Sequence, residues 1–196
     1  MFKWKRNSRG IAEVAYRSSP IPAEQIEIRR LTADDAHAYY GLRLEALERE
    51  PLAFSESIEE HRAITIESIA KRLGAKEDGA ESLVLGAFTE DLVVGMAGFA
   101  RFTGSKKHHK GLIWGVYVKP EWRRKGIARV LLSEIVERAK AIAGIEQILL
   151  SVATDQAAAK NLYQSLGFEV YGREPRTLKI GDRYVDEDLM VLRLTR

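Results

Sequence analysis

One short segment of the chain combines the residue types that bind phosphate groups in proteins. Residues 118–128 read VKPEWRRKGIA, so a proline, three consecutive cations and a glycine precede an apolar helical pattern. Backbone N–H groups at a helix start are unpaired, carry partial positive charge and bind anions. Gly126 would let the backbone approach an anion closely, while Arg123, Arg124 and Lys125 would add positive charge. The segment therefore predicts a phosphate or pyrophosphate site, and a solvated basic loop is the alternative.

Other chemistries are excluded by motifs that the sequence lacks. It contains neither the G-x-x-x-x-G-K-[ST] phosphate loop nor the G-x-G-x-x-G dinucleotide fingerprint. There are no cysteines, which excludes disulfides, thiolate metal sites and cysteine nucleophiles and fits a reducing compartment. The four histidines lack H-E-x-x-H spacing and no G-x-S-x-G occurs, so neither a metal site nor a serine hydrolase is expected.

The hydrophobic pattern predicts a mixed order of strands and helices around this segment. Period-two runs indicate strands, and apolar stripes with helical spacing indicate helices. Residues 51–62 are expected to form a loop that leads into a helix. Residues 1–24 are expected to be a basic, flexible N-terminal extension of a domain that spans 25–196. The expected strands are 26–30, 82–88, 92–102, 112–118, 145–152, 168–171 and 184–194, and the expected helices are 36–50, 65–73, 126–143 and 157–166.

Two motifs resemble those of the GNAT superfamily, whose members are acyl-CoA-dependent N-acyltransferases. Arg123, Gly126 and Ala128 form R-x-x-G-x-A after a V-x-P at 118–120, which is similar to the family's acetyl-CoA loop. Residues 159–168 read AKNLYQSLGF and match the family's A-x-x-L-Y-x-x-x-G-F. The resemblance implies an α/β fold with a twisted, mostly antiparallel central sheet flanked by helices. In this fold the sheet is splayed between the strands expected at 112–118 and 145–152, and the cofactor enters that gap.

The resemblance also implies roles for individual residues. Tyr163 would lie near the thioester sulfur as general acid for the departing thiolate. The backbone of strand 112–118 would pair with the pantetheine arm of acetyl-CoA. The implied cofactor-binding residues are Val116, Tyr117 and Val118 on that strand, Arg123, Arg124, Lys125, Gly126, Ile127, Ala128 and Arg129 around the pyrophosphate, and Gln156 and Tyr163 downstream.

The chain departs from the family's pattern in three places. Arg124 stands where the family often has glycine, and Gln156 stands where many members have asparagine. Many members carry a glutamate base on the strand that matches 112–118, but here that strand has no carboxylate. The base is therefore unassigned, and the backbone of the strand is expected to stabilise the oxyanion. The candidates for the base are a water relay and Glu56, Glu60, His61, His108, His109, Asp186 and Glu187.

The overall composition narrows the range of partners. Lys and Arg number 31 against 28 Asp and Glu, and this net charge of +3 is modest for a nucleic-acid binder. No apolar run approaches the ~18 residues that a membrane span needs, and no secretory signal is seen, so a cytoplasmic protein is expected. Acetyl-CoA and an amine acceptor are the expected partners, without nucleic acid or membrane. A homodimer is also considered, because dimers are common among proteins that resemble this chain.

Three functional hypotheses follow from these features. The first is an N-acetyltransferase, in which a primary amine of a small molecule or protein attacks acetyl-CoA directly in a ternary complex. The second is a non-catalytic acyl-CoA-binding sensor or scaffold, which the missing glutamate would favour. The third is a nucleic-acid-associated protein that uses the basic residues of 1–9 and 106–110 and binds with steep salt dependence.

Overall fold

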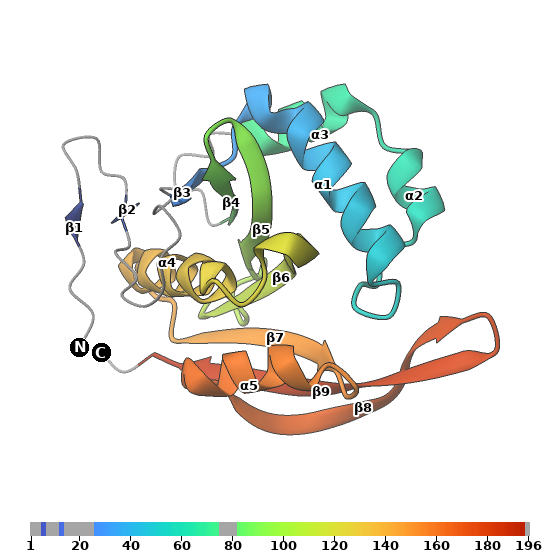
Figure 1. Ribbon diagram of the computed structural model, residues 1–196. Coiled ribbons are helices and arrows are strands. Elements are labelled where there is room, and N and C mark those ends of the chain that lie inside the picture. Colours follow the sequence, from blue (N-terminus) through green and yellow to red (C-terminus); the bar gives the residue numbers. More distant parts are fainter. Residues whose placement is uncertain (1–4, 7–11, 14–25, 75–81, 195–196) are drawn as a thin grey trace.

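The structure is a computed structural model that describes residues 5–6, 12–13, 26–74 and 82–194 (Figure 1). Apart from two short strands, the predicted N-terminal extension lies outside these residues. No helix in the described part of the chain is long and apolar enough to cross a bilayer. The strands are β1 (Lys5–Arg6), β2 (Ala12–Glu13), β3 (Ile26–Arg30), β4 (Ser82–Thr89), β5 (Leu92–Arg101), β6 (Lys110–Val118), β7 (Gln147–Ala153), β8 (Glu169–Ile180) and β9 (Arg183–Arg193). The α-helices are α1 (Ala36–Arg49), α2 (Ile58–Arg62), α3 (Ile66–Gly74), α4 (Ile127–Ala141) and α5 (Ala157–Ser165), and the 3-10 turns are η1 (Ala33–Asp35) and η2 (Pro120–Trp122).

A single sheet connects all the described strands in the order β1-β2-β3-β4-β5-β6-β7-β9-β8. Neighbouring strands are antiparallel except β6 and β7, which are parallel. In Figure 1, β4 and β5 run in a clearly different direction from β7 and β9, so the sheet is strongly twisted. These features confirm the predicted α/β fold with a twisted, mostly antiparallel central sheet.

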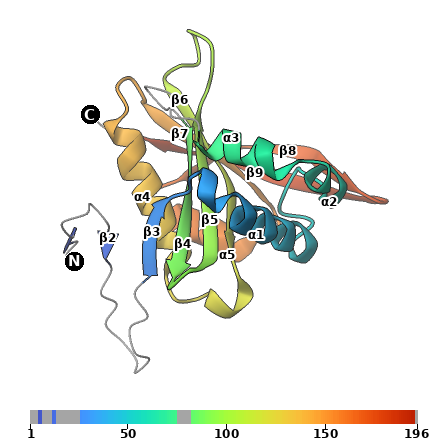
Figure 2. The ribbon, with the colours of Figure 1, turned by 90° about the horizontal axis from the view of Figure 1, so that it is seen from above.

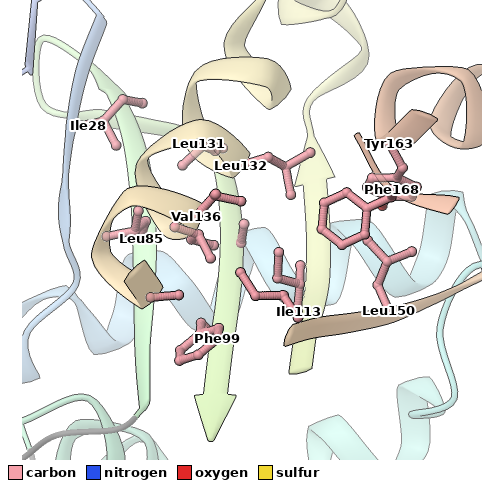
Figure 3. Close-up of a cluster of buried hydrophobic side chains, with 14 of the residues drawn as sticks. Ile28, Leu85, Phe99, Ile113, Leu131, Leu132, Val136, Leu150, Tyr163 and Phe168 are labelled. Atoms are coloured by element: carbon pink, nitrogen blue, oxygen red, sulfur yellow. The ribbon is translucent and has the colours of Figure 1, made fainter. Parts of the chain in front are cut away.

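Helices cover both faces of the first half of the sheet. Figure 2 shows α4 on one side of β4 and β5, with α1 and α3 on the other. Leu131 and Leu132 of α4 are fully buried and pack in one cluster with Phe99 and Ile113 of the sheet (Figure 3). A second cluster on the opposite face includes Leu42 of α1 and Ile69 of α3. Since apolar side chains hold β6 from both faces, the strand is a rigid wall for a site beside it.

The two parallel strands separate soon after they meet. Lys110–Leu112 of β6 pairs with Gln147–Leu149 of β7, and the pairing ends there. The rest of β6 continues along β5, whereas the rest of β7 continues along β9. This leaves a gap between β6 and β7 in the place where the sequence predicted a splayed sheet.

A β-bulge in β6 lies at the edge of this gap. Between the pairs Met96–Tyr117 and Gly98–Trp114, β5 contributes one residue and β6 contributes two. Gly115 is the first of these two, and its φ of +64° favours glycine. Because a bulge bends its strand and increases the local twist, this bulge turns β6 away from β7.

Two segments have more regular structure than the sequence predicted. The strand predicted at 168–171 is the first part of β8, which continues to Ile180 and pairs with β9 in a long hairpin. Most of β8 is exposed, so its sequence EVYGREPRTLKI has no buried face to produce an alternating pattern. Within the predicted loop 51–62, the short helix α2 forms behind a capping box. In that box the backbone N–H of Glu60 donates to Ser57 Oγ at 3.1 Å. In return, the backbone N–H of Ser57 donates to Glu60 Oε2 at 2.7 Å.

Candidate active site

A cavity of about 290 Å³ fills the gap between β6 and β7. Its walls come from β6, β7 and α5, and are completed by the start of α4 and the loop between α1 and α2. The lining is mainly apolar, with valine, alanine, leucine and aromatic side chains from these elements. Among the predicted cofactor-binding residues, the wall includes Val116, Tyr117, Val118, Arg123, Ala128, Gln156 and Tyr163.

The start of α4 has the geometry of an anion site. Gly126 is the N-cap residue with φ +83°, and Arg124 also has a positive φ of +61°. Arg124 and Lys125 are exposed, and the Lys125 ammonium lies 4.1 Å from the ring centroid of Trp122. Ile127 is buried and anchors the first helical turn. The first turn of α4 therefore offers unpaired backbone N–H groups, and two exposed cations directly precede it in the chain.

Two of the predicted phosphate-binding arginines have partners within the protein. Arg123 donates from Nε to the Val118 carbonyl oxygen and from Nη2 to Glu50 Oε1, both at 2.9 Å. Arg129 donates from Nη2 to the Ser165 hydroxyl oxygen at 2.7 Å. Arg123 thus ties the loop before α4 to β6 and α1, while Arg129 ties α4 to α5.

The strand β6 presents its backbone and two valines to the cavity. Val118 is buried and Val116 is half-buried. The side chain of Tyr117 packs toward α1, where its hydroxyl donates to Glu45 Oε1 at 3.1 Å. Burial, and then the charge of Glu45, raise the pKa of Tyr117 to about 12. The hydroxyl therefore holds β6 on α1 and leaves only the backbone of this residue for a ligand.

Tyr163 of α5 lines the cavity. The residue is buried and packs edge-to-face on Phe168, with ring centroids 6.1 Å apart (Figure 3). Burial raises the pKa of Tyr163 to about 12, so the hydroxyl stays protonated at neutral pH. Gln156, the N-cap residue of α5, also lines the cavity.

None of the predicted base candidates lines the cavity within the described residues. Glu60 caps α2, and Asp186 accepts the backbone N–H of Arg176 at 2.8 Å. Burial alone would raise the pKa of Glu56, but donors and positive charge from Arg43 and His61 outweigh it and lower that pKa. The remaining candidates lie elsewhere: His108 and His109 precede β6, and Glu187 is on β9.

Sequence reasoning missed two charged residues beside the cavity. Glu50, which caps the end of α1, is the one carboxylate in the cavity wall among the described residues. Arg43 is buried under the wall, with its Nε 2.9 Å from Glu56 Oε2. A sequence signal for Arg43 exists, because it falls on the buried stripe of α1 with Tyr39 and Leu47 at a spacing of four.

Comparison with known proteins places the chain in a family. Residues 34–168 match the family model described as the acetyltransferase (GNAT) family. The chain belongs to the GNAT acetyltransferase family. The match covers the segment from α1 through α5, which includes both sequence motifs and the residues that line the cavity between β6 and β7.

Individual GNAT proteins resemble the chain over different lengths. The L-methionine sulfoximine/L-methionine sulfone acetyltransferase of Pseudomonas aeruginosa is 32% identical over 96 residues, or 49% of this chain and 52% of that protein. A GNAT acetyltransferase structure from Streptococcus pneumoniae has a TM-score of 0.78 and 23% identity, covering 86% of this chain and 99% of that one. The structure of yncA from Salmonella typhimurium with its cofactor acetyl-CoA has a TM-score of 0.75 and 23% identity, covering 87% and 95%. The chain spans about half the length, or less, of the first curated relatives it matches.

Proposed function

We propose that this GNAT protein is an N-acetyltransferase that transfers the acetyl group of acetyl-CoA to a primary amine. The observation that carries the proposal is the cavity between β6 and β7, whose lining includes Ala128 at the start of α4 and Tyr163 of α5. The helix start, with Arg124 and Lys125, suits the pyrophosphate. The mainly apolar walls suit the pantetheine arm, with main-chain groups of Val116 and Val118 beside it.

The reaction is a direct attack in a ternary complex. The neutral amine attacks the thioester carbonyl carbon, a C–N bond forms, and the C–S bond breaks as the tetrahedral intermediate collapses. A β-bulge leaves one residue of its strand outside the hydrogen-bond ladder. We assign the oxyanion to the backbone N–H groups of Gly115 and Val116 at this bulge, since donors fixed in advance stabilise developing charge most effectively.

Tyr163 serves the departing thiolate in this proposal. A thiol has an ordinary pKa near ~8.5, whereas that of Tyr163 is raised to about 12 by burial. Full proton transfer from the phenol to the thiolate is therefore uphill. The hydroxyl stabilises the leaving sulfur as a hydrogen-bond donor, which refines the general-acid role implied by the resemblance. The proton lost by the amine passes to water in this proposal, because none of the predicted base candidates lines the cavity within the described residues and Glu50 is paired with Arg123.

The alternative is a non-catalytic acyl-CoA-binding sensor or scaffold, which the absence of a carboxylate from β6 favours. The proposal includes no nucleic-acid or membrane partner and places the protein in the cytoplasm. It treats 25–196 as the transferase domain and 1–24 as an extension. For a homodimer, the supporting feature is β8, an edge strand of the described sheet with Val170 and Tyr171 exposed.

Calorimetric titration with acetyl-CoA tests the anion site. We expect the unchanged protein to bind with micromolar affinity, and Arg124→Glu with Lys125→Glu to weaken binding by about tenfold or more. Both side chains are exposed, so the fold should not change. The matched control is Lys106→Glu with Lys107→Glu, which changes the net charge equally in an exposed loop. Equal affinity in the two double variants would contradict the assigned site.

A second measurement separates the enzyme from the sensor. Thiol release from acetyl-CoA is followed in the presence of a panel of amines. An enzyme releases thiol in step with acetylated amine, whereas a sensor binds acetyl-CoA and releases none. Binding without turnover on any amine would therefore replace the proposed transferase by the alternative.

A further inference from the structure

Arg43 occupies an unusual position for a charged side chain. It lies on the buried face of α1, and its side chain is only 7% exposed. Its Nε donates to Glu56 Oε2 at 2.9 Å, and its guanidinium carbon lies 4.5 Å from the ring centroid of Phe54. A buried guanidinium is costly unless its N–H groups are satisfied, so each of them calls for a partner.

The N–H groups on one of its nitrogens have no partner. Among the buried side-chain nitrogen and oxygen atoms of the described residues, Nη1 of Arg43 is the one without a hydrogen bond. The neighbouring groups do not compete for it, because the Glu56 oxygens already face Arg43 Nε and His61 Nδ1. Arg43 Nη1 is therefore a buried donor that lacks an acceptor.

The unpaired group points to the bulge of β6. A Cβ atom placed on Gly115 would lie 3.5 Å from Arg43 Nη1. Apart from residues adjacent to Gly115 in the chain, no other heavy atom of the described residues lies within 4 Å of that point. Gly115 and Phe54 both line the cavity. The guanidinium thus lies directly behind two residues of the cavity wall, beside a small space that the glycine leaves open.

We propose that Arg43 Nη1 binds the carboxylate of the acceptor, and that the acceptor is an α-amino acid. This inference rests on the proposed acetyl transfer and identifies its substrate class. The oxyanion is assigned to the backbone of Gly115 and Val116, so a carboxylate at Nη1 lies only a short distance from the reacting amine. An α-amino acid has this short spacing between its amine and its carboxylate. A polyamine would instead bring a second cation toward an unpaired guanidinium, which is unfavourable.

The loop between α1 and α2 gives the carboxylate access. Nη1 has almost no exposed surface, and the half-buried ring of Phe54 lies over the guanidinium. Phe54 belongs to the segment that joins α1 to α2 and has no regular structure. The incoming carboxylate displaces this ring and completes the hydrogen bonding of Arg43, so acceptor binding removes an unsatisfied buried donor.

Matched acceptor pairs test the proposal. Initial rates of thiol release give kcat/KM for L-alanine, L-methionine and L-phenylalanine, each compared with its amino-acid amide. At least one acid should exceed its amide by about 10- to 100-fold, the range expected for a charge-assisted hydrogen bond. An amide has the less basic amine and hence more of the neutral form, so basicity alone favours the amide. Equal rates for acids and amides, or faster amides, would overturn the proposal.

Variants separate recognition from a purely structural role. Arg43→Gln should lower kcat/KM for the acid by about 10- to 100-fold and leave that for the amide nearly unchanged. A structural role would lower both equally and leave the ratio intact. Gly115→Ala keeps Arg43, adds a methyl group 3.5 Å from Nη1 and strains the backbone at φ +64°. The strain acts on both acceptors, so a fall in the ratio reports the filled space, and the test survives if Arg43→Gln folds poorly. Arg62→Gln on α2, an exposed arginine paired with Glu48, is the control and should keep the ratio.

A binding measurement distinguishes failure of the proposed carboxylate site at Arg43 from failure of the proposed acetyl transfer. Calorimetry with the CoA-loaded protein compares each acid with its amide. Preferential binding of the acid without thiol release would overturn the transferase and support the Arg43 site. Thiol release without preference for the acid would overturn only the Arg43 site. Neither binding preference nor thiol release would overturn both.

Discussion

The hydroxyl of Tyr163 shows how burial determines what a single group can do. The side chain lies in an apolar wall, and desolvation disfavours its phenolate form. A phenol with a pKa of about 12 donates a hydrogen bond at any physiological pH and does not act as a base. The motif around Tyr163 indicated the residue, whereas only the structure shows the strength of its burial.

Replacing Tyr163 with phenylalanine tests this role. The ring still packs on Phe168, so acetyl-CoA affinity should change by less than about threefold. Loss of the donor should lower kcat by about 10²-fold. Steady-state kinetics and acetyl-CoA titration measure the two effects. In the unchanged protein, kcat should show no falling limb from Tyr163 below about pH 10, because the raised pKa keeps the phenol protonated. A variant with unchanged kcat would remove Tyr163 from the mechanism.

Arg124 combines a favourable charge with an unfavourable backbone conformation. Its φ of +61° is one that L residues adopt at a cost of roughly 1–2 kcal/mol. The GNAT family often has a glycine at the position of Arg124. The chain therefore keeps a cation beside the helix start at the expense of local strain, which is common at ligand-binding sites.

A pair of variants separates the charge of Arg124 from its strain. Arg124→Gly and Arg124→Ala both remove the cation, so both should weaken acetyl-CoA binding by the same factor of about three to ten. Only glycine relieves the positive φ, so the glycine variant should be more stable than the alanine variant by about 1 kcal/mol. Calorimetry and urea unfolding measure these differences. Equal unfolding free energies would show that this backbone is not strained.

At the scale of elements, the local signals predicted which strands and helices form, but not how two of them meet. The helical stripe of α4 and the continuous apolar runs of β4 and β5 are local patterns that the sequence shows directly. The bulge at Gly115 arises from the pairing of β6 with β5, and the position of Arg43 Nη1 beside Gly115 arises from the packing of α1 against the sheet. The full length of β8 was missed for a related reason, because a strand exposed on both faces has no apolar period. Features that arise from contacts between residues distant in sequence cannot be predicted from local sequence patterns.

A buried carboxylate connects α5 to the final hairpin. Asp188 of β9 is 1% exposed and accepts from Lys160 of α5 at 2.6 Å and from Arg173 of β8 at 2.8 Å. The hydrogen bond from Arg173, followed by that from Lys160, lowers the pKa of Asp188. The bond network therefore holds the helix that carries Tyr163 against the end of the sheet.

The pH dependence of stability tests this connection. A carboxyl with a lowered folded pKa stabilises the fold above its ordinary pKa near ~4, and this contribution is lost as the pH falls through the folded pKa. Asp188→Asn should therefore lower the unfolding free energy by about 1–2 kcal/mol at pH 7. The difference in unfolding free energy between the variant and the unchanged protein should become smaller as the pH falls from about 5 toward 3, where the carboxyl is protonated. Denaturant unfolding at each pH measures the gap. Asp155→Asn, in an exposed pair with Arg183, is the control and should cost less than about 0.5 kcal/mol.

At the scale of the whole molecule, the sheet is divided by its central gap. The part from β3 to β6 packs under α1, α3 and α4, and the part from β7 to β9 carries α5. Between the two parts, the sheet is continuous through the three residue pairs of β6 and β7. A ligand that fills the gap would contact both parts and stabilise the folded state by mass action.

Thermal unfolding measures this effect. Acetyl-CoA at about 100 times its dissociation constant should add about 2.7 kcal/mol of stability, which corresponds to roughly 5–10 °C for a chain of this size. The double variant Arg124→Glu with Lys125→Glu should show a much smaller shift at the same concentration. No shift in the unchanged protein would mean that acetyl-CoA does not bind the folded state.

The early separation of β6 from β7 has a consequence for how the protein can diversify. One edge of β6 has lost its peptide neighbour beyond Leu112, and in the proposed complex the pantetheine arm takes that neighbour's place. The acyl donor then behaves as a removable strand that completes the sheet. A strand is recognised through main-chain groups, which every residue type supplies except proline. Side chains on the face of β6 that points to α1 can therefore change to suit a new acceptor without loss of the donor.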